Sequence, residues 1–315
     1  MGDVIFATSL GLSDYREAWR LQHTFHAHCR TTEDNVLLLT EHYPVVTLGH
    51  RRPYEQLLLF AADLVEKGIR LVTSERGGGA TYHGPGQLTA YPIFSTLLRR
   101  YGIKEFVVRL EEVMRRVSQD FGVPATQRFG LPGLWVGERK MGAIGIAVRR
   151  GTSLHGFALN VNVDLRPFSY IVPCGLTGKG VTSLAQETRE EVTMQAVVEQ
   201  VRQAFQVIFA VPVKEMTDGW SYPNVLSINN SYNSEPALLL GHATTWVGSG
   251  SESKVCGVGS RAGRAQPPFV GGGRSASPGV GWSDAAGKGH WDVAQYSLPG
   301  KAGAGAKGRS CRARG

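Results

Sequence analysis

The strongest constraint on the fold is the way the hydrophobic period changes along the first 213 residues of this 315-residue chain. Between Glu105 and Phe121, apolar residues recur every three or four positions, which is typical of an amphipathic helix. Between Phe157 and Val163 they recur at every second position, which is typical of a strand. Helical and strand-like segments follow one another in mixed order. The sequence therefore predicts an α/β (α+β) fold with a mixed, largely antiparallel sheet flanked by helices.

Shorter patterns predict the remaining elements. Ser13 is expected to cap a first helix, and two more helices are expected over residues 60–67 and 194–209. Strands are expected over residues 36–39, 45–48, 69–73, 88–94 and 143–148, the last one entered through a hairpin at residues 135–140. No apolar run approaches the length of about 18 residues that a membrane span needs, so we predict no membrane contact.

The chain changes character after Val213. From Gly219 to the end it holds 19 of the 40 glycines, and ten Lys or Arg against four Asp or Glu. The first 218 residues hold 24 basic and 22 acidic residues, so most of the net charge of +8 belongs to the C-terminal part. We predict a globular domain over residues 1–215 and a Gly-rich, basic, disordered tail over residues 216–315. A tail that contacts nucleic acid or an acidic partner is the alternative to a solvated appendage, which we favour.

The cysteines give no sign of a disulfide-stabilised or secreted protein. Cys29, Cys174, Cys256 and Cys311 form no CxxC pair and no compact disulfide framework. The N-terminal segment has no basic region followed by a long apolar run, and it is not Arg-rich like a mitochondrial presequence. We therefore expect reduced thiols and a cytoplasmic location.

A glycine-rich segment between two expected strands is the first candidate binding element. It runs Arg76-Gly77-Gly78-Gly79-Ala80-Thr81-Tyr82-His83 and continues to Gln87. Its glycines allow positive φ and a close approach of backbone to ligand, while its Arg, Tyr and His can hydrogen-bond a ligand or contact an oxyanion. A tight connection without a ligand is the alternative. The segment lacks the GxxxxGK[ST] pattern, so nucleotide binding has little support.

Small residues mark a second candidate. They occur in the segments Lys140-Met141-Gly142-Ala143-Ile144-Gly145 and His155-Gly156-Phe157-Ala158, on two expected strands. Such residues leave space for a channel in which an extended acyl chain could lie. From these residues alone, ordinary close packing of strands is the better supported interpretation.

Cys174 is the candidate nucleophile. Pro173 and Gly175 place it on a turn, although an isolated cysteine is more often a small buried apolar residue. Lowering the pKa of a thiol from about 8.5 to about 6.5 takes about 2.7 kcal/mol. A lysine ammonium about 4 Å away supplies about 4 kcal/mol at an effective dielectric near 20. One neighbouring lysine would therefore be enough.

A cluster at the end of the first expected helix is a candidate metal site. It consists of His23, His26, His28 and Cys29, with His23 and His26 one turn apart. These side chains could bind zinc. A polar helix face is the favoured interpretation, so we expect no metal.

Together, these segments resemble a known family. RGGGATYHGPGQLTAYPIF, GERKMGAIGIAVRRG, SLHGFALNVNVDL and PCGLTGKGVTSL are similar to the ordered motifs of lipoyl(octanoyl) transferases, and TEHYPVVTLG is similar to the family's N-terminal strand pair. The resemblance covers roughly residues 1–210 and departs at Gly142, where alanine is expected. It implies the fold shared by biotin protein ligases and lipoate ligases.

The resemblance also implies a reaction and its residues. Cys174 would be the nucleophile and Lys140 the group that lowers its pKa. The acyl-binding residues would be Arg76, Gly77, Gly78, Gly79, Ala80, Thr81, Tyr82, His83, Ala143, Ile144, Gly145, Gly156, Phe157 and Ala158. The enzyme would take an octanoyl group from octanoyl-acyl carrier protein and pass it to a lysine on lipoyl domains of 2-oxoacid dehydrogenase complexes and on the glycine cleavage H protein. No metal, nucleotide or other cofactor would be needed, and Lys140 or His83 would act as base.

Two rival enzymes share the implied fold. An ATP-dependent lipoate or biotin ligase would consume ATP with free octanoate, but this chain has no GRGRRG-like segment and a ligase needs no cysteine nucleophile. An amidotransferase that moves octanoyl or lipoyl groups between lipoyl domains would use the same cysteine chemistry, and only the family motifs separate it from the octanoyltransferase.

Overall fold

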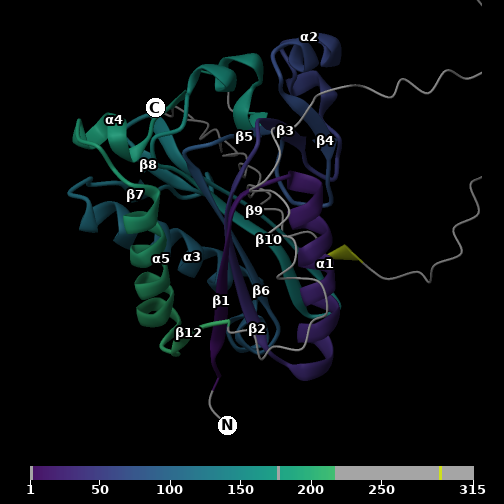
Figure 1. Ribbon diagram of the computed structural model, residues 1–315, viewed down its shortest axis with the longest axis vertical. Helices are drawn as coiled ribbons and strands as arrows, with labels where there is room; N and C mark the ends of the chain where they lie inside the picture. Colours follow the sequence, from purple (N-terminus) through teal and green to yellow (C-terminus); the bar gives the residue numbers. More distant parts are fainter. Residues whose placement is uncertain (1–2, 176–177, 217–290, 293–315) are drawn as a thin grey trace, which may run out of the picture. The chain divides into compact units, whose positions relative to one another are not determined.

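The structure is a computed structural model that describes residues 3–175, 178–216 and 291–292 (Figure 1). The helices are α1 (Tyr15–Thr32), α2 (Ala61–Glu66), α3 (Thr96–Asp120), α4 (Leu184–Thr188) and α5 (Met194–Phe209), and the short 3-10 helices are η1 (Tyr54–Gln56), η2 (Arg166–Tyr170) and η3 (Pro173–Gly175). The strands are β1 (Ile5–Ser13), β2 (Asn35–His42), β3 (Val45–Leu48), β4 (Arg70–Thr73), β5 (Thr81–His83), β6 (Gln87–Phe94), β7 (Thr126–Gln127), β8 (Leu134–Val136), β9 (Arg139–Arg149), β10 (Thr152–Asn160), β11 (Gly180–Val181), β12 (Val213–Glu215) and β13 (Trp291–Asp292).

The main sheet has the strand order β12-β1-β2-β6-β10-β9-β8-β7. β1 runs parallel to β2 and to β12, whereas β2, β6, β10, β9, β8 and β7 pair antiparallel with one another. β11 and β13 also pair with β9, parallel and antiparallel respectively. The predicted α/β class with a mixed, largely antiparallel sheet is therefore confirmed.

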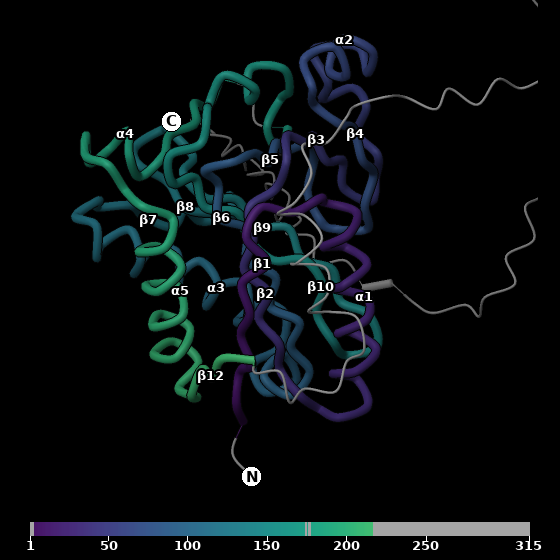
Figure 2. The backbone as a smooth tube through the Cα atoms, in the orientation of Figure 1, coloured from purple at the N-terminus to yellow at the C-terminus, as the bar shows by residue number. Residues whose placement is uncertain are grey.

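Helices cover both faces of this sheet. α1 packs on one face, over β2, β6 and β10, through an apolar cluster that includes Phe25 and Tyr91. α3 and α5 lie side by side on the other face, as Figure 2 shows, and bury a larger cluster that includes Phe94, Phe157 and Phe205. Because both faces are covered, every residue of β10 is buried.

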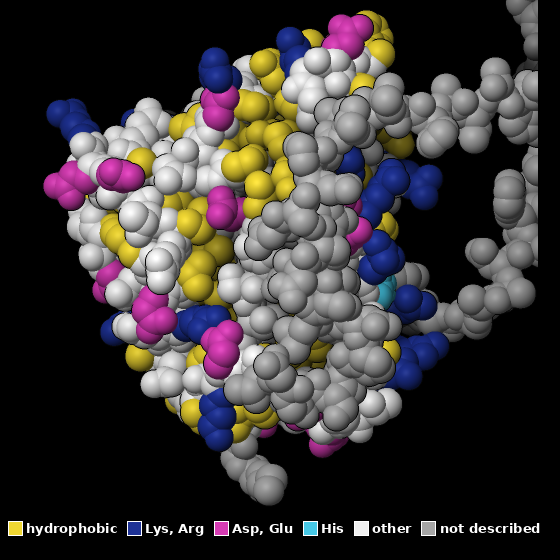
Figure 3. All heavy atoms as spheres, in the orientation of Figure 1, with side chains coloured by type: hydrophobic (Ala, Val, Ile, Leu, Met, Phe, Trp, Pro, Cys, Tyr) yellow, Lys and Arg dark blue, Asp and Glu magenta, His cyan; other side chains and the backbone are white. Residues whose placement is uncertain are grey.

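A smaller sheet stands beside the main one. Its order is β4-β3-β5, and α2 packs against β4. Its apolar side contacts Phe168 and Ile171, which precede the segment that carries Cys174. Phe60 and Val65, at the start and inside α2, are 82% and 66% exposed, and apolar side chains are visible over α2 at the top of the face in Figure 3.

The first helix is capped by a different residue from the predicted one. Ser13 is the last residue of β1, a strand that the sequence patterns did not predict. The cap is Asp14, whose carboxylate accepts hydrogen bonds from the backbone N–H groups of Arg16 (2.9 Å) and Glu17 (3.4 Å). An ionised acceptor satisfies the unpaired N–H groups at a helix start and also interacts favourably with the helix dipole.

Two predicted boundaries were also wrong. The helix predicted from Glu105 begins at Thr96. Its backbone breaks at Gly102 (φ 73°), which interrupts the apolar period, so the sequence pattern did not reveal the turns before Glu105. The strand predicted over 157–163 starts at Thr152 and ends at Asn160, because its first residues are buried on both faces and do not alternate in polarity. The tail predicted from residue 216 lies outside the described residues, apart from Met216 and residues 291–292.

The aromatic cluster under α5 should dominate the stability of the domain. The Phe205 ring is fully buried and lies 5.5 Å from Phe209 and 6.2 Å from Phe157, centre to centre. Phe205→Ala should lower the free energy of unfolding by about 3–5 kcal/mol in urea titrations, since it leaves a cavity. Val207→Ala, which is 52% exposed on the same helix, is the control. Equal losses in the two variants would contradict this account of the core.

Candidate active site

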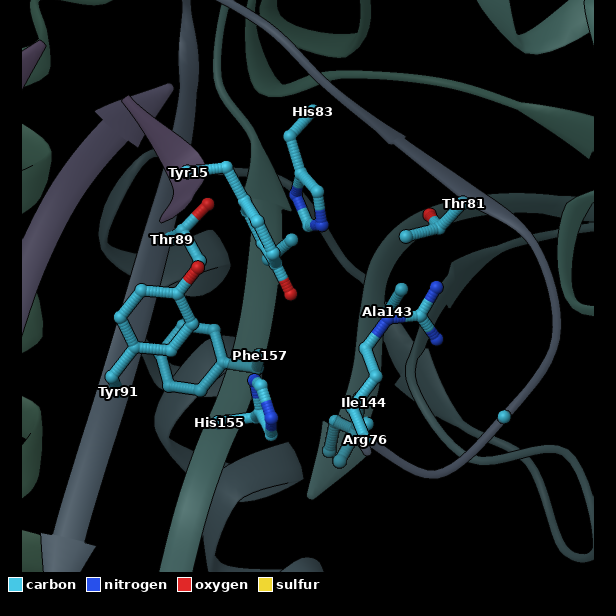
Figure 4. A pocket seen from close by; sticks show the side chains of 14 residues that line it. Tyr15, Arg76, Thr81, His83, Thr89, Tyr91, Ala143, Ile144, His155 and Phe157 are labelled. Atoms are coloured by element: carbon cyan, nitrogen blue, oxygen red, sulfur yellow. The ribbon is translucent and has the colours of Figure 1, made fainter. Parts of the chain in front are cut away.

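A hollow lies between the main sheet and the glycine-rich segment. Ten of its lining residues were predicted from the sequence: Arg76, Gly78, Thr81, His83, Ala143, Ile144, Gly145, Gly156, Phe157 and Ala158. The hollow also contains four residues that were not predicted to bind a substrate: Tyr15, Thr89, Tyr91 and His155. Figure 4 shows Tyr91 and His155 on one side of the hollow and Thr81 and Arg76 on the other.

Close packing of backbone explains two of the small residues, and an acyl channel at the others stays a prediction. A Cβ atom on Gly156 would lie 2.1 Å from the carbonyl oxygen of Ala90, so this glycine serves the close pairing of β10 with β6. A Cβ atom on Gly145 would lie 2.8 Å from the carbonyl oxygen of Gly77, so this glycine lets the glycine-rich segment approach β9. The space itself lies next to Ala143 and Ala158, on paired positions of β9 and β10.

Arg76 fastens the glycine-rich segment to the smaller sheet. Its guanidinium group is buried and donates to the carbonyl oxygen of Thr47 (2.6 Å), to the hydroxyl of Thr47 (2.8 Å) and to the carbonyl oxygen of Gly77 (3.0 Å). A planar cation with several donors can hold two backbone segments at once. Arg76 therefore builds a wall of the hollow.

His83 has a defined tautomer. Gln87 donates through Nε2 to the carbonyl oxygen of Tyr82 (3.1 Å) and to Oδ1 of Asn160 (2.9 Å), so its own Oε1 faces His83 Nδ1 at 2.7 Å. Nδ1 of His83 must therefore carry the proton, and Nε2 keeps its lone pair, 3.4 Å from the Thr47 hydroxyl. Burial, followed by the charges of His42 and Arg76, holds the pKa of His83 well below its usual value, so the ring is neutral at pH 7.

His155 combines burial, backbone strain and unsatisfied ring nitrogens. Its φ is +58°, which is rare for a residue other than glycine, and it is 1% exposed. Within the described part of the chain neither ring nitrogen makes a hydrogen bond of ordinary geometry. Oε1 of Glu75 lies 3.6 Å from Nε2. The sequence motif contained this histidine, but only its neighbours were predicted to bind the acyl chain.

Glu75 joins the hollow to the surface of α1. Its Oε1 accepts from Nε1 of Trp19 (3.0 Å) and lies 2.8 Å from Nε2 of His23. Burial alone would raise the pKa of Glu75, but His155, His23 and Trp19 together lower it, so the carboxylate stays ionised. Burial lowers the pKa of His155, and Glu75 opposes this effect.

Cys174 and Lys140 lie in segments that are joined by hydrogen bonds. Cys174 is in η3, which lies beside β5, and Val172 donates its N–H to the carbonyl oxygen of Gln56 (2.7 Å). Further along the same segment, Val181 pairs with Lys140, and Thr182 donates its N–H to the carbonyl oxygen of Lys140 (3.0 Å). The thiol of Cys174 lies outside what the structure describes, so its distance from the Lys140 ammonium stays a prediction.

The described surroundings of Lys140 are partly aromatic and partly acidic. Its side chain is buried, and its Nζ lies 5.2 Å from the centre of the Trp135 ring. Burial raises the pKa of Glu111, whereas the Gly133 N–H and the charge of Lys140 lower it.

The remaining predicted residues, Gly77, Gly79, Ala80 and Tyr82, do not line the hollow, and the Tyr82 ring packs on Phe168 at 5.5 Å instead.

The histidines of α1 do not converge. His23 faces Glu75, His26 contacts the carbonyl oxygen of Arg149 (2.9 Å), and His28 contacts Asp34 (2.8 Å). Cys29 is fully buried, and burial followed by the charge of Asp34 raises the pKa of its thiol to about 12. No group of three metal-ligating side chains occurs among the described residues. In the same part of the chain, no helix has the length and apolar character to cross a membrane.

Comparisons of the sequence with known proteins decide the family. The model of the lipoyl protein ligase A/B catalytic domain matches residues 14–206. An octanoyltransferase of Roseiflexus sp. (strain RS-1) is 48% identical over 197 residues, which cover 61% of this chain and 82% of the relative. An octanoyltransferase of Desulfotalea psychrophila is 47% identical over 186 residues, which cover 58% of this chain and 83% of the relative. This chain belongs to the octanoyltransferase family, and it is an acyltransferase.

Solved structures confirm the fold that the motifs implied. A lipoate-protein ligase A bound with ATP superposes with a TM-score of 0.58 at 18% identity, over 69% of this chain and 90% of that one. A bipartite lipoate protein ligase from Thermoplasma acidophilum gives a TM-score of 0.55 at 19% identity, over 69% of this chain and 88% of that one. At identities this low, the superpositions show only that this chain has the same fold as the ligases.

Buried neutral histidines should make the protein sensitive to acid. Nε2 of His42 lies 2.7 Å from the Tyr91 hydroxyl oxygen, and burial lowers the pKa of His42 to about 4. The unfolded chain binds this proton near pH 6.5, so the free energy of unfolding should fall by about 2–3 kcal/mol between pH 6.5 and 4.5 for His42 alone. Urea titrations at several pH values measure this loss.

Two variants measure how much of the stability lost in acid comes from His42. His42→Gln should reduce the fall in unfolding free energy between pH 6.5 and 4.5 by the share of His42, about 2–3 kcal/mol. His50→Gln, at an exposed position, should leave the fall as in the wild type. A wild-type free energy of unfolding that is constant from pH 6.5 to 4.5 would show that the buried histidines do not titrate as inferred.

Proposed function

We propose that this octanoyltransferase takes an octanoyl group from octanoyl-acyl carrier protein, holds it as a thioester on Cys174, and transfers it to the ε-amine of a lysine on lipoyl domains. The observation that carries the proposal is the hollow between β9, β10 and the glycine-rich segment, lined by Ala143, Phe157 and Ala158 and flanked by the β5 strand that contacts η3. Such a lining suits an alkyl chain, which gains about 0.8 kcal/mol for each buried CH2 group.

The first half-reaction exchanges one thioester for another. The thiolate of Cys174 attacks the carbonyl carbon of the octanoyl thioester, and the carbonyl electron pair moves to oxygen. When this pair returns, the carbon–sulfur bond to the carrier breaks, and the carrier's thiolate takes up a proton. Lys140 would stabilise the Cys174 thiolate through its positive charge. The thioester carries the activation, so no nucleotide is consumed.

The second half-reaction makes an amide. A lysine with a pKa of about 10.4 is protonated at pH 7 and must lose a proton before it attacks the octanoyl-enzyme. Of the two candidate bases, His83 has a lone pair at Nε2, because its Nδ1 proton is held by Gln87. The attack expels Cys174 as a thiolate, and the nitrogen loses its second proton. Over the whole cycle one proton is released for each acceptor lysine that starts as an ammonium ion.

The proposed acceptors are the lipoyl domains of 2-oxoacid dehydrogenase complexes and the glycine cleavage H protein, and the proposed location is the cytoplasm. The T. acidophilum relative in fold was solved in a study of that ligase and its E2 lipoyl domain, which supports an acceptor of this kind. An ATP-dependent ligase remains the rival: turnover of free octanoate with ATP would favour it, and turnover of octanoyl-carrier protein without ATP would exclude it.

Intact-mass analysis tests the nucleophile. After mixing with octanoyl-carrier protein, the wild type should gain one octanoyl increment that maps to Cys174, and Cys174→Ser should gain none. Lys140→Ala should form the adduct at least about tenfold more slowly, because the thiol is then less ionised at pH 7. Cys29→Ala, which removes the buried thiol of α1, is the control and should behave as wild type. An adduct on another residue would overturn the assignment.

Filling the hollow should change the preferred chain length. Ala143→Ile adds carbon atoms where the acyl chain is proposed to lie, so octanoyl transfer should slow at least about tenfold. Transfer of a butyryl group, which reaches less far, should change by less than about twofold. Ala61→Ile, at an exposed position of α2, is the control. If octanoyl and butyryl transfer slow equally in Ala143→Ile, the hollow is not the acyl site.

A further inference from the structure

We propose that Gln56 is a further catalytic residue: its side-chain N–H group donates a hydrogen bond to the carbonyl oxygen of the octanoyl thioester as that oxygen gains negative charge. The inference rests on the proposed function, in which Cys174 carries the octanoyl group. Gln56 ends the short helix η1, is partly buried, and belongs to none of the motifs that identified the family.

Two hydrogen bonds fix the position of Gln56. Its backbone carbonyl oxygen accepts from the N–H of Val172 at 2.7 Å, two residues before Cys174. Its side-chain Oε1 accepts from the N–H of Ala80 at 2.7 Å, in the glycine-rich segment. Because a backbone N–H can only donate, the second bond also decides which end of the amide is oxygen and which is nitrogen.

The amide group lies between two glycines of different motifs. A Cβ atom on Gly79 would be 2.1 Å from Oε1 of Gln56, and a Cβ atom on Gly175 would be 3.0 Å from Nε2. Gly175 also has a φ of +70°, so glycine suits this position in two ways. Nε2 is 3.0 Å from the Cβ position of both glycines, so it lies between the glycine-rich segment and the residue directly after Cys174, while Oε1 lies on the side of the glycine-rich segment.

The N–H group of Gln56 is available to a substrate. Within the described part of the chain no carbonyl or side chain accepts a hydrogen bond from Nε2, whereas Oε1 is occupied by Ala80. Attack of the Cys174 thiolate moves an electron pair from the carbon–oxygen double bond onto oxygen. A donor that is already in place stabilises this oxyanion without reorganisation. Removing one such donor typically slows acyl transfer by about 10²–10³-fold.

Two substitutions separate donation from simple positioning. Gln56→Glu keeps an oxygen for the Ala80 N–H but loses the donor, whereas Gln56→Met loses both and stays neutral. The rate of octanoyl adduct formation from octanoyl-carrier protein should fall by about 10²–10³-fold in both variants. Alkylation of Cys174 by iodoacetamide builds no oxyanion at a thioester. At a pH where the thiol is fully ionised, the rate of alkylation in both variants should stay within about threefold of the wild-type rate. Gln56→Met is the cleaner comparison, because it adds no charge. Gln119→Glu, at an exposed position of α3, controls for the added charge.

The outcomes distinguish this inference from the proposed function. If Gln56→Glu is acylated as fast as wild type, Gln56 is no oxyanion donor and the inference fails alone. If acylation and alkylation fall equally in Gln56→Met, Gln56 acts only on the position of the thiol, and the inference also fails. If the wild type forms no adduct at Cys174, the proposed function is wrong, and this inference, which rests on it, is wrong as well.

Discussion

The candidate site depends on a close backbone approach between the glycine-rich segment and two strands. A Cβ atom on Gly49, at the end of β3, would lie 2.0 Å from the carbonyl oxygen of Gly78, and the N–H of Gly77 donates to the carbonyl oxygen of Ile146 in β9 (3.0 Å). Side chains at these positions would push the segment away from the sheet. Arg76, buried against Thr47, supplies the polar contacts that hold it there. The glycines are thus required for the wall of the hollow, and flexibility is not their main role.

A chain of side-chain amides connects this wall to the segment that follows Cys174. The carbonyl oxygen of Thr182 accepts from Nδ2 of Asn160 (2.9 Å), which orients Asn160 so that its Oδ1 accepts from Gln87. Gln87 in turn fixes the proton of His83 on Nδ1. Since each amide is oriented by the next, the tautomer of His83 is set by the backbone carbonyl of Thr182, the residue directly after Val181, which pairs with Lys140. Buried networks of this kind hold a reactive group in one protonation state.

The sequence predicted the elements and motifs better than it predicted their boundaries and their contacts. The period of Phe106, Leu110 and Val113 identified α3, but Gly102 hid its first turns. β1 was missed because its burial alternates only in its first residues. The motifs predicted ten of the residues that line the hollow, since their glycines and small residues lie in order along the chain. Tyr15 could not be assigned in this way, because only the packing of α1 on the sheet brings it to the hollow.

The packing of α1 on the sheet also explains why a strained histidine persists in the middle of β10. A positive φ at a residue other than glycine costs on the order of 1 kcal/mol or more. At His155 this conformation directs the backbone N–H to the side chain of Gln22 in α1 (2.9 Å) and the ring toward Glu75, which Trp19 and His23 of the same helix also contact. A helix that only covered the sheet would need apolar contacts alone. Because α1 instead supplies partners for the buried Glu75 carboxylate and for the backbone N–H of His155 at the edge of the hollow, it is part of the candidate site, and these contacts offset the strain at His155.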